Sequence, residues 1–220
     1  SQKELIAALS HEMRTPLARI RFALAVIDDQ AEDELKEKLR GMNDDVQEID
    51  DLVSSMLSYA RLDHPDIKMN LQDVPIANWL DLLIGRTPAG SIEIRANLDA
   101  APDTVSMDPR LMELALSNLL VNAAKYAETR VRCSVKREGN DYLLSVEDDG
   151  QGVPQHERDT VFKAFTRLDD SRNRETGGYG LGLAIVARVA ELHGGTARVD
   201  VSPNLDGARF SLRWPVEYGQ

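Results

Sequence analysis

Apolar residues recur at steps of four and three near the start of the sequence, and this repeat constrains the fold more than any other feature. The first run of such positions comprises Leu5, Leu9, Met13, Leu17, Ile20, Leu24 and Ile27. The second run comprises Leu35, Leu39, Met42, Val46, Ile49, Val53, Met56 and Ala60. This spacing places side chains on one face of an α-helix, so the sequence predicts two long helices joined by a short turn at residues 28–30.

The two predicted helices form a hairpin whose apolar stripe is widened by Leu52 and Leu57. One partner helix cannot cover so wide a stripe, so we expect two copies of the hairpin to form a dimeric four-helix bundle. Pro16 lies inside the first helix, where it lacks a backbone N–H and its ring clashes with the preceding turn. We therefore expect that helix to bend near residues 12–16.

The pattern changes at His64-Pro65-Asp66, because a proline disfavours helix in the residue before it. Short alternating runs then predict strands at residues 92–96, 131–135, 142–146, 196–201 and 208–214. Helical patterns lie between these runs at residues 76–84, 109–126 and 181–192. The predicted fold class is multidomain α and α/β: a helical hairpin over residues 1–64, a linker over 65–69, and over 70–217 an α/β sandwich with helices layered on a mixed sheet.

Charge and composition exclude several classes of function. The net charge of −11 argues against a nucleic-acid partner, because binding phosphates requires clustered Lys and Arg. Cys133 is the only cysteine, so an internal disulfide and a thiolate metal cluster are excluded, and a reducing compartment such as the cytoplasm is expected. No run of about 18 apolar residues occurs, so we expect no membrane contact by this fragment.

The segment Ser10-His11-Glu12-Met13-Arg14-Thr15-Pro16-Leu17 lies on the first predicted helix. A histidine on a helix is usually just exposed or hydrogen-bonded, but an imidazole with a pKa of about 6.5 is largely neutral at physiological pH and can attack a phosphorus atom. The segment resembles the phosphoacceptor box of sensor histidine kinases. That resemblance implies that His11 accepts a phosphoryl group, that Glu12 takes its proton, and that Thr15 ends an E-x-x-T element that positions water for dephosphorylation.

The predicted helix 109–126 carries Asn118-Leu119-Leu120-Val121-Asn122-Ala123-Ala124-Lys125-Tyr126. Asparagine in a helix is often merely exposed or capping, but amide oxygens one turn apart also suit a hard cation. The segment resembles the N box of the same family's ATP-binding domain. By that resemblance Asn122 coordinates Mg²⁺, Asn118 lies beside it, Lys125 meets phosphate charge and Tyr126 flanks the nucleotide.

Two glycine-rich segments follow. Asp148-Asp149-Gly150-Gln151-Gly152 comes directly after a predicted strand, and Gly178-Tyr179-Gly180-Leu181-Gly182-Leu183 opens the predicted helix 181–192. Asp-Gly pairs mark ordinary turns, and an isolated glycine triplet indicates little. In this order, however, the segments resemble the two glycine boxes of the family. That resemblance implies that Asp148 accepts a hydrogen bond from the adenine amino group, and that Gly150 and Gly152 let the backbone approach the base. It also implies that backbone N–H groups of the second box face the phosphates, the residues being Gly178, Gly180, Leu181 and Gly182.

A long polar loop between the two glycine boxes contains Arg167, Arg172 and Arg174. Its composition favours a flexible lid over a nucleotide, and we expect one of these arginines to help hold the γ-phosphate. At the start of this loop, Val161–Asp169 resembles the F box of the family, whose aromatic residues tether the lid. Phe162 and Phe165 are equally consistent with plain core anchors.

All five boxes occur in the order of the family, so the chain is identified as a member of the bacterial sensor histidine kinases, and residues 59–63, 167–172 and 207–211 resemble the RstB type. The resemblance implies a Bergerat (GHKL-type) ATP-binding fold, with ATP and Mg²⁺ as cofactors. It implies a homodimer, with a response-regulator receiver domain as the partner that takes the phosphoryl group onto an aspartate. It also implies that this is the cytoplasmic portion of an inner-membrane sensor kinase whose sensor and membrane-spanning parts precede it.

Two other functions are compatible with such a nucleotide fold. An ATP hydrolase related to this family has a glutamate one turn before the Mg²⁺-binding asparagine, whereas this chain has Asn118 there, and an amide cannot act as a general base. A catalytically inactive dimerisation scaffold would show damaged ATP boxes, yet Asn122, Asp148, Gly150 and Gly180 are present. The predicted function is therefore autophosphorylation of His11 from ATP, with phosphatase activity toward the phosphorylated regulator as a second activity.

Overall fold

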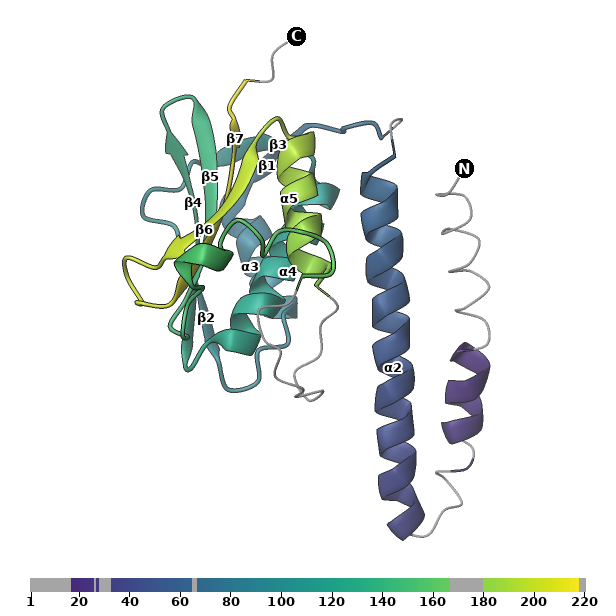
Figure 1. The fold of residues 1–220 in the computed structure, drawn as a ribbon. Helices are drawn as coiled ribbons and strands as arrows, with labels where there is room; N and C mark the ends of the chain where they lie inside the picture. Colours follow the sequence, from purple (N-terminus) through teal and green to yellow (C-terminus); the bar gives the residue numbers. More distant parts are fainter. Residues whose placement is uncertain (1–16, 26, 28–32, 65–66, 167–179, 218–220) are drawn as a thin grey trace. The chain divides into compact units, whose positions relative to one another are not determined.

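The structure is a computed structural model that describes residues 17–25, 27, 33–64, 67–166 and 180–217. The chain divides into two compact units, residues 1–67 and 68–220. The first unit is helical and the second combines a sheet with helices, as Figure 1 shows. This is the predicted fold class. The predicted helix before residue 17, with its bend at residues 12–16, lies outside the described residues.

The first unit contains a helical segment over residues 17–25 and the long helix α2 (Asp33–Leu62). Leu17 and Leu24 share a buried cluster with Leu39 and Val46 of α2. All four belong to the apolar repeat, so the predicted pairing of the two helices is confirmed where the structure describes them. Other apolar positions on these helices remain exposed, namely Ile20, Phe22, Ile27, Leu35, Met42 and Ile49. The two helices therefore leave a second apolar surface without cover.

The second unit is built on a five-stranded sheet with the strand order β2-β4-β5-β7-β6. Its strands are β2 (Glu93–Asn97), β4 (Arg130–Glu138), β5 (Asp141–Asp148), β6 (Thr196–Val201) and β7 (Ala208–Pro215). The β2–β4 pair is parallel, and the other neighbouring pairs are antiparallel. The predicted mixed sheet is therefore confirmed, with each strand within a few residues of its predicted position.

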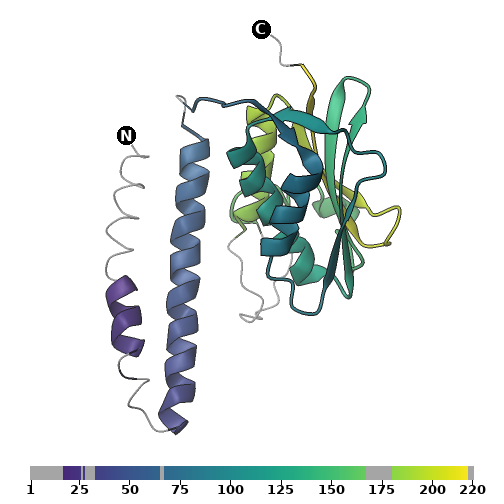
Figure 2. The same cartoon turned by 180° about the vertical axis from the view of Figure 1, so that it is seen from behind.

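The three α-helices that the structure describes in the second unit lie on one face of this sheet, as Figures 1 and 2 show from opposite sides. They are α3 (Ile76–Arg86), α4 (Pro109–Tyr126) and α5 (Gly182–Leu192). Successive side chains of a strand point to opposite faces, so the alternating fully buried residues Leu144 and Val146 mark the helix-covered face of β5. None of the helices that the structure describes combines the length and apolar character needed to cross a membrane.

A separate two-stranded sheet, formed by β1 (Gln72–Pro75) and β3 (Thr104–Met107), was not predicted. Each strand has only four residues. In β1 only Val74 is buried, and although β3 alternates, with Val105 and Met107 buried, the run is too short to be recognised as a strand. The Trp214 indole of β7 donates a hydrogen bond to the Ser106 carbonyl of β3 at 3.2 Å, which ties the small sheet to the large one.

The buried residue Asp108 joins three parts of the second unit. Its carboxylate caps α4 by accepting hydrogen bonds from the Arg110 and Leu111 N–H groups. The same carboxylate accepts the Asn70 N–H at 2.8 Å, close to where the chain begins the second unit. The Asp108 N–H donates to Nε2 of His193, just after α5, at 3.1 Å. The helices α4 and α5 are therefore held at one end by shared hydrogen bonds.

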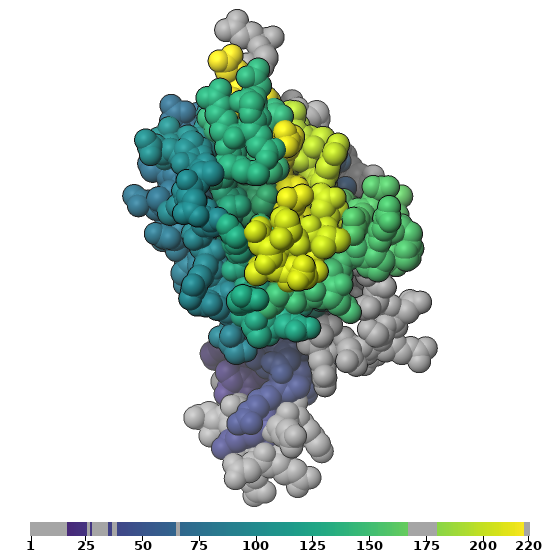
Figure 3. All heavy atoms as spheres, turned by 90° about the vertical axis from the view of Figure 1, so that its left-hand side faces the viewer, coloured from purple at the N-terminus to yellow at the C-terminus, as the bar shows by residue number. Residues whose placement is uncertain are grey.

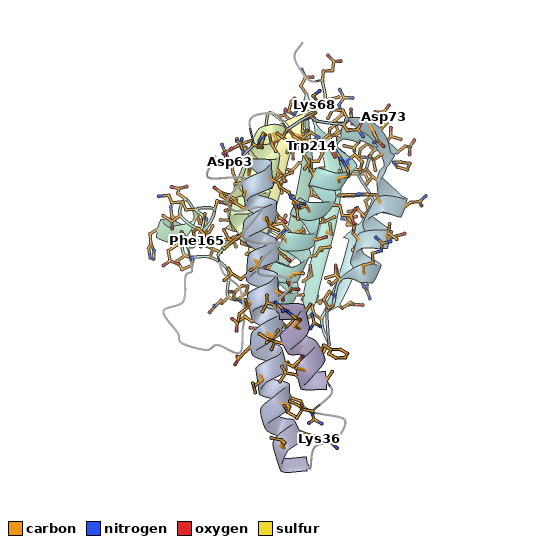
Figure 4. All side chains as sticks on the ribbon, turned by 90° about the vertical axis from the view of Figure 1, so that its right-hand side faces the viewer. Lys36, Asp63, Lys68, Asp73, Phe165 and Trp214 are labelled. Atoms are coloured by element: carbon orange, nitrogen blue, oxygen red, sulfur yellow. The ribbon has the colours of Figure 1, made fainter. Side chains whose placement is uncertain are left out.

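His193 is fully buried and uses both ring nitrogens. Its Nδ1 lies 2.8 Å from the Val189 carbonyl, which can only accept, so Nδ1 carries the proton and Nε2 accepts from Asp108. The ring also meets Trp214 edge to face at 6.4 Å. In Figure 4, Trp214 lies at the same end of the second unit as Lys68. Burial lowers the pKa of His193 in spite of the nearby Asp108 charge, so the folded state favours the neutral ring.

We expect the second unit to lose stability as the pH falls through the ordinary histidine range. His193 titrates near 6.5 once unfolded and at a lower pH when folded, so below 6.5 the unfolded chain binds more protons. Both tryptophans, Trp79 and Trp214, lie in the second unit, so their fluorescence during urea unfolding at pH 7.5 and 5.5 reports its stability. His193→Gln, whose amide can replace both hydrogen bonds, should show a smaller fall. An equal fall in stability in the parent and in His193→Gln would contradict the assignment of this pH dependence to His193.

Candidate functional site

The helix α4 presents the residues of the predicted N box. It forms here because Asp108 caps it, Pro109 occupies its first turn, and one face is apolar and fully buried, with Met112, Ala115, Leu116, Leu119, Leu120 and Ala123. Asn118, Asn122 and Lys125 are half-buried, and Tyr126 is exposed. Residues four apart lie above one another on a helix, so the structure brings Asn118 and Asn122 onto one side of α4.

Asn118 links α4 to the start of α5. Its Nδ2 donates to the Leu114 carbonyl at 2.8 Å, which fixes the orientation of the amide. A Cβ atom on Gly182 would lie 2.8 Å from the Asn118 Oδ1, closer than real Cβ contacts. Gly182 therefore lets the first turn of α5 approach the asparagine side of α4.

Asp148 ends β5 with a buried carboxylate that is 2% exposed. Its Oδ1 accepts hydrogen bonds from the Gly150 N–H at 3.0 Å and the Ala208 N–H at 3.1 Å. No described residue donates a hydrogen bond to Oδ2, so this oxygen can accept one from a ligand. Burial raises the pKa of Asp148, and the neighbouring Asp149 charge adds to the effect. A donor such as an exocyclic amino group would stabilise the ionised form.

The first glycine box packs directly against the C-terminal end of α4. A Cβ on Gly150 would lie 2.1 Å from the Tyr126 carbonyl oxygen, and only glycine permits so close an approach. Gly152 has a positive φ of 73° and lies beside Gly207. A Cβ on Gly207 would meet Asp148 Oδ1 at 2.6 Å. Gly207 therefore lines the candidate site, although in the sequence it belonged only to the segment 207–211 and was not predicted as a site residue.

The second glycine box also contains a turn with a positive φ, just before α5. Gly180 has a φ of 70°, and a Cβ there would lie 2.5 Å from the Thr166 carbonyl. The Leu181 side chain is buried, so only its backbone can face a ligand. α5 begins at Gly182, and the first N–H groups of a helix have no partner within the helix and attract anions.

The two predicted aromatic residues have different environments. Phe162 meets Phe210 of β7 edge to face at 6.2 Å, which attaches this segment to the sheet. Phe165 is 63% exposed with a φ of 64°, so it is not a core anchor, and it lies at the periphery of the second unit (Figure 4). Its N–H donates to the Gly180 carbonyl at 2.9 Å, which joins this segment to the second glycine box.

The predicted site residues fall into two groups. The structure brings together Asn118 with Gly182, Tyr126 with Gly150, and Asp148 with Gly150. Lys125 lies over the Tyr126 ring, with Nζ 4.8 Å from its centroid. Seven predicted residues lie outside the described residues: His11, Glu12, Thr15, Arg167, Arg172, Arg174 and Gly178.

The residues present fit a hard divalent cation bound together with a phosphate ligand. Asn122 offers an amide oxygen on the same side of α4 as Asn118, and Mg²⁺ is usually bound by few protein oxygens, with phosphates and waters supplying the rest. Among the described residues, no group of three or more His, Cys, Asp or Glu side chains is arranged to hold a metal ion.

Two family models match the sequence. Residues 107–218 match the family described as histidine kinase-, DNA gyrase B-, and HSP90-like ATPase. Residues 1–65 match the family described as His Kinase A (phospho-acceptor) domain. The first match alone covers half of the chain, and the two together cover the helical unit and most of the α/β unit.

The chain is also similar to individual sensor proteins. It is 40% identical to the sensor protein RstB of Escherichia coli over 98% of the chain and 49% of that protein. It is 34% identical to the sensor-type histidine kinase PrrB of Mycobacterium leprae over 97% of the chain and 48% of that protein. The chain therefore spans about half the length of these relatives.

Solved structures show the same arrangement of elements. Full-length ShkA in complex with AMPPNP superposes with a TM-score of 0.81 at 28% identity, covering 98% of this chain and 46% of that one. The ATP-binding domain of PrrB from Mycobacterium tuberculosis gives a TM-score of 0.54 at 31% identity, covering 67% of this chain and 98% of that one.

Gly150→Ala should separate the first glycine box from α4. The added methyl group would overlap the Tyr126 carbonyl, and overpacking of this kind costs about 1–3 kcal/mol. Urea unfolding followed by tryptophan fluorescence measures that cost. Gly85→Ala in α3 is the matched control, because nothing lies within 4 Å of its Cβ and alanine favours a helix, so it should be stabilising by about 0.5–1 kcal/mol. Equal stability of Gly150→Ala and the parent protein would contradict the described packing.

Proposed function

The chain belongs to the bacterial sensor histidine kinases, and we propose that it transfers the γ-phosphoryl group of ATP to His11 and from there to an aspartate of a response-regulator receiver domain. One observation carries the proposal. Asp148, with an oxygen open to a ligand, shares a site with the asparagine side of α4 and the start of α5. A sequence matching a phosphoacceptor domain lies on the same chain.

Asp148 is proposed to select adenine. Its Oδ1 is already occupied by two backbone N–H groups, so Oδ2 is the atom that would accept the exocyclic amino group. Gly150 and Gly152 keep side chains away from the plane of the base, and the exposed ring of Tyr126 lies at the adjoining end of α4. A buried carboxylate that accepts hydrogen bonds discriminates strongly against a base without the amino group.

The phosphates are proposed to lie between α4 and the start of α5. The N–H groups of the first turn of α5, which have no partner within the helix, and the Lys125 ammonium supply positive charge there, with Gly180 and Gly182 permitting close approach of the backbone; by the family resemblance Gly178 is proposed to do the same. Asn122 is the proposed ligand for Mg²⁺. When bound, the metal neutralises phosphate charge and polarises the γ-phosphorus toward attack.

His11 is the proposed nucleophile. A neutral imidazole nitrogen attacks the γ-phosphorus in line with the departing ADP, while Glu12 accepts the proton from the other ring nitrogen. The phosphoryl group then passes to the receiver-domain aspartate. Thr15, four residues after His11 in the sequence, is proposed to orient the water that hydrolyses the aspartyl phosphate of the regulator, releasing inorganic phosphate. The match of residues 1–65 to the phosphoacceptor domain supports these assignments.

Hydrolysis of ATP by water is disfavoured by Asn118. The position one turn before Asn122 would need a carboxylate to activate water, and an amide has no basicity to do so. In addition, the Asn118 Nδ2 is engaged with the Leu114 carbonyl, so this side chain serves as a structural element. The nucleotide is therefore kept for a protein nucleophile.

The exposed apolar surface of the helical unit supports a homodimer. Ile20, Ile27, Leu35, Met42 and Ile49 belong to the heptad-like repeat and remain exposed in a single chain. A second copy of the hairpin would bury them in a four-helix bundle, at about 25 cal/mol for each Å² of apolar surface removed from water. We place this catalytic portion in the cytoplasm, where ATP and the receiver domain are found, as part of an inner-membrane sensor kinase.

His11→Ala should abolish autophosphorylation. Protein incubated with γ-labelled ATP and Mg²⁺ should acquire label that is stable in base and labile in acid, as expected for a phosphoramidate. His156→Ala, which changes a histidine whose side chain is 81% exposed, is the matched control and should label normally. Label that persists in His11→Ala would overturn the assignment of the nucleophile.

Asn122→Ala should weaken Mg²⁺-dependent ATP binding by about tenfold or more, which corresponds to about 1.4 kcal/mol. Titration calorimetry with and without excess EDTA separates the metal-dependent part, and sedimentation should show an unchanged dimer because the helical unit is a separate core. Asn140→Ala, at an exposed turn between β4 and β5, should bind as the parent does. Unchanged binding by Asn122→Ala would contradict its role as a metal ligand.

A further inference from the structure

Three consecutive carboxylates, Glu147, Asp148 and Asp149, lie at the end of β5 and contact three different parts of the second unit. Because side chains of a strand alternate, Asp148 points to the helix-covered face of the sheet and Glu147 to the opposite face. Figure 3 is a view from the side of that opposite face. Glu147 lies between Arg132 of β4 and Arg209 of β7 in the strand register. Only Asp148 belongs to the proposed nucleotide site, so its two neighbours need a separate explanation.

Asp149 holds the turn that follows α4. Its Oδ1 accepts hydrogen bonds from the N–H groups of Glu128, Thr129 and Arg130, each at 3.0 Å, and its Oδ2 accepts the Thr129 hydroxyl. Although partial burial raises the pKa of Asp149, these hydrogen bonds outweigh it and hold the pKa well below its usual range. The charged carboxylate is therefore strongly held in this position.

This turn begins directly after Lys125 and Tyr126, at the end of α4. On the other side of Asp149, Gly150 touches the Tyr126 carbonyl. The Asp149 hydrogen bonds thus fix the end of α4 against the first glycine box. Without them the turn would still be held by the Glu93 N–H, which donates to the Thr129 carbonyl at 2.9 Å, but Lys125 and Tyr126 would be fixed less firmly relative to Asp148.

Glu147 holds the turn between β6 and β7. It is 4% exposed, and its carboxylate accepts hydrogen bonds from the Ser202 hydroxyl at 2.7 Å and from the Asn204 side-chain amide at 2.9 Å. The Ser202 hydroxyl oxygen in turn accepts the N–H groups of Asn204 and Leu205. The turn is therefore organised around a buried acceptor, and loss of that acceptor would leave the buried Ser202 hydroxyl without its hydrogen-bond acceptor.

The β6–β7 turn leads into the residues that orient Asp148. Ser202 N–H donates to the Gly207 carbonyl, Gly207 packs against Asp148, and the Ala208 N–H donates to Asp148 Oδ1. The geometry on both sides of Asp148 is therefore set by its two neighbours. Asp149 fixes α4 and the first glycine box, and Glu147 fixes the turn that occupies Oδ1.

We propose that Glu147 and Asp149 are positioning residues for adenine recognition, holding the surrounding backbone so that Asp148 Oδ1 stays occupied and Oδ2 faces the base. This inference rests on the proposed function of Asp148. Neither residue touches the nucleotide. A purely structural role would lower stability and leave base selectivity intact, so selectivity is the decisive measurement.

The test compares the binding of ADP and inosine diphosphate, which has a carbonyl in place of the amino group, by titration calorimetry on the full chain. Asp149→Ala and Glu147→Ala should each weaken ADP binding by about tenfold and inosine diphosphate binding much less, so that the preference for adenine shrinks. Asp149→Asn keeps an oxygen for the three N–H groups and should restore most of the preference. Asp141→Ala, at the opposite end of β5, should leave the preference unchanged.

Two milder variants replace the alanine variants if those do not fold. Thr129→Val removes one hydrogen bond to Asp149, and Ser202→Ala removes one hydrogen bond to Glu147. They should reduce the preference by a few-fold. A parent protein that does not prefer ADP would overturn the proposed role of Asp148. A parent that prefers ADP, with folded variants that keep this preference whatever their affinity, would overturn the present inference alone.

Discussion

The structure of the second unit depends on how α4 is held at its two ends. At the start, Asp108 caps the helix and binds the chain at Asn70. At the end, Asp149 accepts the N–H groups of residues 128–130. The face between these points is fully buried against the rest of the unit. The helix therefore cannot rotate or slide, and Asn118 and Asn122 are presented at a fixed angle.

This constraint explains why so much of the site consists of glycine contacts. With α4 fixed, other segments can reach its exposed side only where they carry no side chain. Gly150 comes within contact of the Tyr126 carbonyl, and Gly182 comes within contact of the Asn118 amide. Backbone N–H groups are thereby left close to the helix, which suits a ligand rich in phosphate oxygens. The same closeness makes these positions intolerant of even one added methyl group.

Local patterns predicted most of the fold and part of the site. The bounds of α4 were predicted to the residue, because a capping aspartate, a proline and a strong helical period agree there. The sheet β1–β3 was missed because four-residue strands carry little periodicity, and their pairing joins residues some 30 positions apart. The roles proposed for Glu147, Asp149 and Gly207 were not predicted, because they depend on groups far away in sequence. The only local signal was the unbroken acidic triplet before Gly150.

The bond between Asn70 and Asp108 has a mechanical consequence. Asn70, near the start of the second unit, and the first turn of α4 both donate hydrogen bonds to the Asp108 carboxylate. A movement of either one is therefore transmitted to the other. A displacement of residues 68–70 would therefore act directly on the Asp108 cap of α4, and through the Asp108 N–H on the neutral ring of His193. The helix that presents Asn118 and Asn122 is therefore also the element to which the start of the second unit is attached.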